Sequence, residues 1–201
     1  MKKLKISFNS PVVLGFIFLS LAVLLLGFVT LGKSNELLFI TYHSSLANPL
    51  TYVRFFTHVL GHGGWEHYIG NATYILLLGP MLEEKYGSKK ILSIILITAA
   101  VTGIFNYVFF WNVALCGASG VVFAFILLTS FTSFKNGEIP LTFILVAVVF
   151  IGQQIYEGVM VQDDISNLSH IIGGIIGAVV GYRLNKPGVL QSMGLQTVRH
   201  N

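Results

Sequence analysis

The sequence predicts an all-α polytopic membrane protein, a bundle of six transmembrane helices with both termini in the cytoplasm. Two observations predict this class. Of the 201 residues, 54% are hydrophobic and only 10% are charged, whereas about 25% are charged in an ordinary soluble domain. The chain also holds six apolar stretches, and six spans of about 20 residues each leave room for one membrane domain. We expect that domain at residues 11–186, between a cytoplasmic N-terminus at 1–10 and a short cytoplasmic tail at 187–201.

The first expected helix is the apolar run at residues 11–31, which follows a basic start. Its length and the lack of a small-residue cleavage site favour an uncleaved helix over a signal peptide. Residues 33–66 are too interrupted by polar side chains to span and too apolar to remain in water, so we expect them in the membrane interface. The other five expected spans are residues 67–82, 91–111, 117–131, 139–156 and 168–184.

The positions of the basic residues support this topology. With six helices alternating from a cytoplasmic N-terminus, ten of the twelve Lys and Arg residues lie inside, and only Lys33 and Arg54 lie outside. Such a bias is typical of membrane proteins. The net charge of +4 could suggest nucleic acid as a partner, but no run of basic and aromatic residues alternates as single-strand binding requires. We therefore expect membrane lipid as the surroundings and no nucleic-acid partner.

Among the polar side chains within the apolar spans, four stand out: His67, Asn71, Ser119 and His170. Polar groups inside a membrane are costly and mark functional sites by default. They begin the second, fourth and sixth spans, which all run from outside to inside in the expected topology. The sequence therefore predicts that these side chains meet near the outer leaflet.

A stripe of small residues follows His170. Gly173 and Gly177 lie on nearly the same helical face as the histidine, which lets a neighbouring helix approach closely. The small residues around Ser119 offer a matching surface. A serine within hydrogen-bond reach of a histidine is an activated nucleophile. The alternative is that the glycines only pack helices and that the serine hydroxyl bonds its own helix.

His67 and Asn71 are four residues apart and share a helical face. Both can donate hydrogen bonds, so they could stabilise an oxyanion together with the backbone N–H of Ser119, or they could simply bond across helices. A third interpretation takes His58, His62 and His67 as zinc ligands. That spacing matches no complete metal motif, and we expect neither a metal nor another cofactor.

Together these motifs resemble the rhomboid intramembrane serine proteases, and the resemblance covers essentially the whole membrane core. It rests on Gly-Ala-Ser-Gly at residues 117–120, on His170 with the glycines that follow it, and on His67-x-x-x-Asn71. One departure is visible, because Val53 stands where the family has a tryptophan before the first-loop arginine. The expected fold is the minimal six-helix rhomboid-like bundle.

The resemblance implies a role for each of these residues. Ser119 would be the nucleophile and His170 the general base, without a third carboxylate. The implied oxyanion and substrate-binding residues are His67, Asn71 and Gly117, and the implied supporting residues are Phe123, which would stack on His170, Gly173, Gly177 and His62. The substrates would be membrane proteins with a transmembrane segment, cut near the extracellular face of a bacterial plasma membrane.

A peptide bond must reach such a site from the membrane. We expect residues 157–167 to cap it through Met160, and the fifth helix near Phe150 to act as a lateral gate. Two functions of other classes stay open: a transporter or channel, and an inactive rhomboid-like binding protein. The sequence does not indicate the oligomeric state.

Overall fold

The computed structural model describes residues 7–133, 141–160 and 164–185, and in that part the chain forms helices joined by loops. Its helices are α1 (Pro11–Val29), α2 (Pro49–Thr57), α3 (Trp65–Tyr86), α4 (Ser88–Phe109), α5 (Ser119–Ser130), α6 (Leu141–Met160) and α7 (Asp164–Leu184). A π-helical turn at Asn35–Phe39 and 3₁₀ turns at His58–Leu60 and Phe131–Ser133 complete them. Each of the six expected spans coincides with one of the longer helices. Helix α2 lies within the segment expected at the interface.

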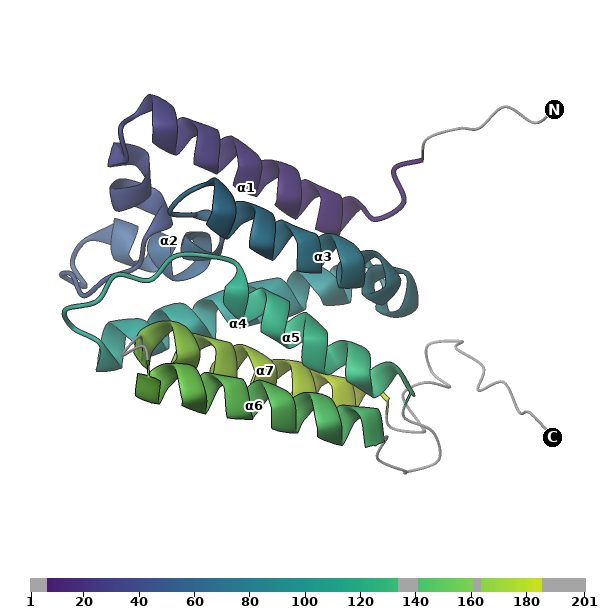
Figure 1. The fold of residues 1–201 in the computed structure, drawn as a ribbon. Helices are drawn as coiled ribbons and strands as arrows, with labels where there is room; N and C mark the ends of the chain where they lie inside the picture. Colours follow the sequence, from purple (N-terminus) through teal and green to yellow (C-terminus); the bar gives the residue numbers. More distant parts are fainter. Residues whose placement is uncertain (1–6, 134–140, 161–163, 186–201) are drawn as a thin grey trace, which may run out of the picture.

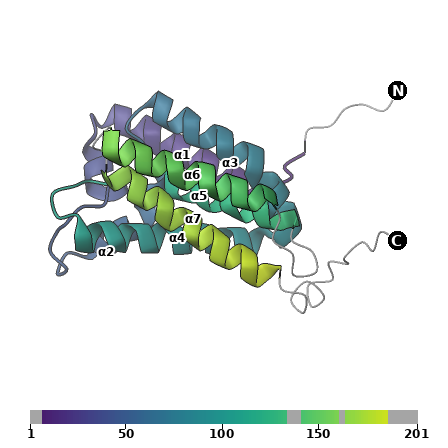
Figure 2. The ribbon, with the colours of Figure 1, turned by 60° about the horizontal axis from the view of Figure 1, so that its bottom comes forward.

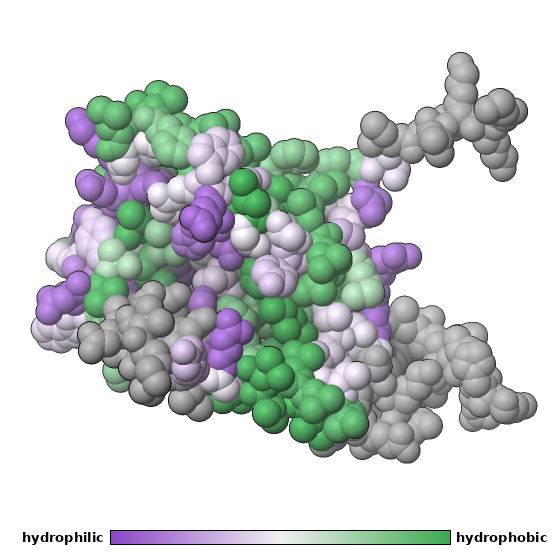
Figure 3. Space-filling view, in the orientation of Figure 1, coloured by the Kyte–Doolittle hydropathy of each residue, from purple (hydrophilic) through white to green (hydrophobic). Residues whose placement is uncertain are grey.

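The longer helices form a bundle in which α1 begins and α7 ends at the same end, and α2 packs at the opposite end (Figures 1 and 2). Helices α1 and α4 are long and apolar enough to cross a bilayer, and Ser119–Ser130, Leu141–Gln153 and Ser169–Leu184 are shorter apolar helices. Apolar surface covers much of the bundle, whereas hydrophilic side chains gather around α2 and at the other end (Figure 3). The number of membrane crossings and the side on which the termini lie stay predictions.

Helix α5 is the central element. It contacts α3, α4, α6 and α7, and its side chains Val121, Ala124, Phe125 and Leu128 are fully buried. This explains why α5 is apolar all round, since a helix surrounded by other helices has no face for polar residues. Its first residue, Ser119, is half-buried.

A buried carboxylate joins three helices at the end where α1 begins. Glu83 of α3 is 4% exposed and accepts hydrogen bonds from the backbone N–H groups of Val12 and Val13, at 3.1 and 2.9 Å, and from the Ser88 hydroxyl at 2.6 Å. The first N–H groups of a helix have no partner within it, and a negative charge there is favourable. Glu83 thus fixes the start of α1, and through Ser88 the start of α4, against α3.

We expect Glu83→Ala to lower the free energy of unfolding by about 1–3 kcal/mol, because buried N–H groups at the start of α1 lose their acceptor. The melting temperature in detergent measures this. Glu84→Ala is the matched control, since the neighbouring Glu84 is exposed. Equal melting temperatures for the two variants would contradict the role of Glu83.

Candidate active site

The structure brings the four polar residues to the end of the bundle that carries α2. His67 and Asn71 occupy the first two turns of α3, Ser119 is the first residue of α5, and His170 lies in the second turn of α7. The starts of all three helices lie at that end (Figure 1). Segments more than 90 residues apart in the sequence therefore meet there.

Helices α5 and α7 touch through their backbones next to Ser119 and His170. A Cβ added to Gly173 would collide with the carbonyl oxygen of Gly120, and one added to Gly177 would collide with that of Ala124. Gly120 follows Ser119 directly, and Gly173 lies one turn after His170. The glycines thus permit the contact that sets the serine and the histidine on facing turns.

Gly117 places the backbone before Ser119 against the two side chains of α3. Its φ of +119° is a conformation that favours glycine. A Cβ at this position would lie 2.5 Å from His67 Nε2 and 3.8 Å from Asn71 Nδ2. A side chain here would therefore collide with the imidazole and fill the space into which both nitrogens point.

The hydrogen bonds around these nitrogens leave them able to donate. The backbone N–H of Gly63 donates to His67 Nδ1 at 3.5 Å, so in the neutral ring the hydrogen is on Nε2, the nitrogen that faces Gly117. Asn71 is 8% exposed, and its Nδ2 is buried without a hydrogen-bond partner in the described residues. An unsatisfied buried donor costs about 1–3 kcal/mol. A ligand oxygen atom that accepts a hydrogen bond from Asn71 Nδ2 would remove this cost.

An aromatic stack leads from His170 toward α6. The Phe123 ring lies 4.3 Å from the His170 ring and 4.1 Å from the Phe150 ring. Phe150 is only 7% exposed, so the residue expected at a lateral gate is packed inside the bundle. Met160 ends α6, but its side chain and those of the rest of the expected cap, residues 157–167, lie outside the described part of the structure.

His58 holds the loop before α5 in place, a role that the sequence did not reveal. This histidine is 1% exposed. Its Nδ1 lies 3.1 Å from the carbonyl oxygen of Arg54 and its Nε2 lies 3.2 Å from the Thr102 hydroxyl, while its own carbonyl accepts from the N–H of Gly117 at 3.0 Å. Only Thr102, a polar residue within an apolar span, could have suggested this contact.

Two further backbone bonds support the same loop. Thr41 and Leu115 form an antiparallel bridge with N···O distances of 2.9 and 2.8 Å. The bridge joins the segment between α1 and α2 to the segment between α4 and α5. Residues 33–66, expected only to rest in the interface, therefore also support the backbone that precedes Ser119.

Burial keeps two of the loop histidines neutral. It lowers the pKa of His58 to about 4. It also lowers the pKa of His62 to about 4, with a smaller contribution from neighbouring His67. In neutral His58 the Nδ1–H donates to the Arg54 carbonyl, while the Thr102 hydroxyl donates to the Thr98 carbonyl at 2.7 Å. Within the described residues, no three His, Cys, Asp or Glu side chains are grouped so as to hold a metal ion.

The depressed pKa values predict a loss of stability in acid. An exposed histidine has a pKa of about 6.5, so between about pH 6.5 and pH 4 the unfolded chain binds protons that folded His58 and His62 do not. Stability therefore falls as the pH drops through this window. We expect melting temperatures in detergent to show this dependence and His58→Gln to reduce its slope. An unchanged slope in that variant would contradict the burial of a neutral His58.

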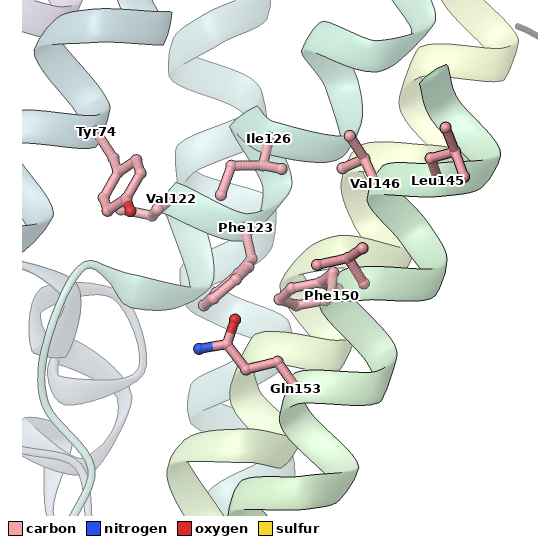
Figure 4. A pocket seen from close by; sticks show the side chains of 9 residues that line it. Tyr74, Val122, Phe123, Ile126, Leu145, Val146, Phe150 and Gln153 are labelled. Carbon is pink, nitrogen blue, oxygen red and sulfur yellow. The ribbon is translucent and has the colours of Figure 1, made fainter. Parts of the chain in front are cut away.

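A cavity of about 470 Å³ opens between α3, α5 and α6, next to the aromatic stack. The rings of Phe123 and Phe150 lie side by side in its wall, and Gln153 of α6 points toward them (Figure 4). Tyr74 lines the opposite side, one turn after Asn71 on α3. The cavity therefore adjoins the aromatic ring that stacks on His170.

Comparison with known proteins decides the family. A family model for the rhomboid domain matches residues 49–187, more than half of the chain, including all four polar residues. The chain belongs to the rhomboid family. It is therefore an integral membrane protein, and its rhomboid domain contains the candidate active site formed at the starts of α3, α5 and α7.

Two relatives illustrate the similarity. The rhomboid is 26% identical over 157 residues to the rhomboid protease GlpG of Haemophilus influenzae, covering 76% of this chain and 80% of that protein. It is 31% identical over 138 residues to the rhomboid-related protein 1 of Caenorhabditis elegans. That second match covers 64% of this chain and only 39% of the longer worm protein.

Proposed function

We propose that this rhomboid is an intramembrane serine endopeptidase that cleaves transmembrane segments of other membrane proteins near the extracellular face. Ser119 is the nucleophile and His170 the general base, and the site works in the plasma membrane of a bacterium. The observation that carries the proposal is the position of Gly117, whose backbone lies against two hydrogen-bond donors immediately before a serine at the start of a helix.

The proposed reaction is an acyl transfer through a covalent intermediate. The Ser119 hydroxyl attacks the peptide carbonyl carbon while His170 accepts its proton. The resulting oxyanion collapses, the peptide C–N bond breaks, and His170 returns the proton to the leaving amine. Water then attacks the acyl-serine ester with His170 again as base, which releases the new carboxyl terminus and restores the hydroxyl.

The largest contribution of the site to the proposed reaction is stabilisation of the oxyanion by hydrogen-bond donors. His67 Nε2–H and Asn71 Nδ2 point into the space beside Gly117, and the N–H of Ser119, as the first of a helix, has no acceptor within that helix. Preorganised donors of this kind each contribute about 2.7–4 kcal/mol in a water-poor site. The positive end of the α5 dipole adds to the same effect.

The cavity between α3, α5 and α6 is the proposed route for the substrate. Tyr74 of α3 and Val149 of α6 line this cavity and are 52% and 68% exposed, so it opens onto the outer surface of the bundle, and a small outward movement of α6 would widen it. Phe150 is the residue that such a movement would draw away from Phe123. This is the lateral gate, with residues 157–167 as the proposed cap above it.

We expect a link between α3 and α6 to slow cleavage of transmembrane substrates. Cysteines at Tyr74 and Gln153, in a Cys116→Ala background, would be joined by a short bifunctional maleimide. Each single-cysteine variant treated in the same way is the control. If the linked protein cleaves as fast as the controls, the substrate enters elsewhere.

The proposal is tested by incubating the purified protein, reconstituted in vesicles, with a panel of single-span membrane proteins and sequencing the product termini. We expect cleavage within the membrane segment near its extracellular end, and none by the Ser119→Ala protein. Cleavage that persists in that variant, or no cleavage of any panel member by the folded wild type, would overturn the proposal.

A further inference from the structure

A second cavity lies on the other side of Phe150, between α5, α6 and α7. Its volume is about 160 Å³, and every residue around it is apolar. It is separate from the larger cavity. Phe150 is the one residue that lines both, and its ring divides them. Its lining residues are Leu127, Phe143, Ala147, Phe150, Ile151, Ile171, Gly174, Ile175 and Ala178.

The lining restricts what can fill this second cavity. Water needs two or more polar partners in a buried site, and the lining residues offer no polar side chain. A helix of another protein is about 10–12 Å across and too wide to enter. An apolar cavity of about 150 Å³ is known to hold a molecule the size of benzene, so a short length of hydrocarbon fits.

The cavity is continuous with the outer surface of the bundle. Ile151 of α6 and Ile175 of α7 both line it, and they are 47% and 57% exposed. Because the rhomboid is an integral membrane protein and these residues lie within apolar stretches of their helices, that surface faces lipid acyl chains. Hydrocarbon therefore reaches the cavity directly from the bilayer.

We propose that the second cavity is a binding site for the acyl chain of a membrane phospholipid. Part of one chain leaves the bilayer between α6 and α7 and occupies the space beside Gly174 and Ala178. There it supports the Phe150 ring from behind, on the side opposite the substrate cavity. The same ring stacks on Phe123, and Phe123 stacks on His170. The lipid therefore contacts a ring that is separated from the proposed catalytic base by Phe123 alone.

A photoreactive phospholipid tests the proposal without any reference to catalysis. The Ser119→Ala protein would be reconstituted in vesicles of phosphatidylcholine and phosphatidylglycerol containing a phosphatidylcholine with a diazirine midway along one acyl chain. After illumination, mass spectrometry of peptide fragments locates the adducts. We expect adducts at Ala147, Gly174 and Ala178 to exceed those at Leu92 and Leu96, two exposed apolar residues of α4.

Variants that fill the cavity provide the decisive comparison. Ala178→Leu, from α7, and Ala147→Leu, from α6, should each reduce the adducts on the cavity wall several-fold and leave those on α4 unchanged. Val179→Leu is the matched control, because Val179 is exposed on α7 beside Ala178 but does not line the cavity. Wall adducts that survive both filling variants, or that join two copies of the chain instead of lipid, would overturn the proposal. Failure of the proposed protease activity would leave this result unaffected.

Discussion

Ser119→Ala is expected to abolish proteolysis while the protein keeps its fold. The change removes one oxygen atom from a small side chain at the start of α5. Without the nucleophile no acyl-enzyme forms, so only the small rate enhancement from binding and oxyanion donors remains. Product formation from a reconstituted transmembrane substrate measures the effect, with the melting temperature as the check on folding.

Ser130→Ala is the matched control for this experiment. Ser130 ends the same helix, and its hydroxyl donates a hydrogen bond to the Ile126 carbonyl one turn earlier. We expect near-normal activity from this variant. His170→Ala should lose as much activity as Ser119→Ala, and the double variant should be no worse than either, because residues that act as a unit are not additive. Substantial turnover by a folded Ser119→Ala protein would exclude the serine mechanism.

Asn71→Ala is expected to reduce turnover about 10²–10³-fold, the usual loss for one oxyanion donor. The Asn71 amide nitrogen is buried and unpaired in the described structure, so its removal breaks no protein–protein hydrogen bond of that nitrogen. The loss should fall mainly on kcat, because the donor acts on charge that develops in the transition state. Steady-state kinetics on one transmembrane substrate separates kcat from KM.

The exposed Asn112, in the loop after α4, provides the control, and Asn112→Ala should cleave normally. A chelator distinguishes the donor interpretation from the metal interpretation, since both involve His67. We expect EDTA to leave the wild-type rate unchanged. A rate that EDTA abolishes and zinc restores, or an Asn71→Ala variant as active as Asn112→Ala, would contradict the oxyanion role.

Hydropathy was sufficient to predict the six longer helices, with their ends to within a few residues, but it did not predict α2. The span expected at 67–82 extends to Tyr86 as α3, and the one expected at 117–131 begins only at Ser119 as α5. The glycines explain the second difference, since the positive φ of Gly117 interrupts the helix. The meeting of α3, α5 and α7 at one end was also predictable, because alternate helices of a membrane bundle run in the same direction.

The contacts that arrange the site were not predictable from the same pattern. Hydropathy shows that a residue leaves water but not which partner it meets, so the hydrogen bond from Gly63 to His67 had no sequence signal. Phe150 was predicted at a lateral gate, which stays a prediction, but its stacking on Phe123 could not be predicted. Such contacts depend on how helices far apart in sequence approach one another, which one sequence alone does not determine.

Labelling with a fluorophosphonate tests the proposed nucleophile most directly, because the reagent forms a covalent bond only with an activated serine. Purified protein would be treated with a small fluorophosphonate, and the adduct located by mass spectrometry. We expect one adduct, on Ser119, absent from the Ser119→Ala variant, strongly reduced in His170→Ala and retained in Ser130→Ala. A folded wild-type protein without an adduct on Ser119, or with equal labelling in the His170→Ala variant, would contradict the proposed serine–histidine mechanism.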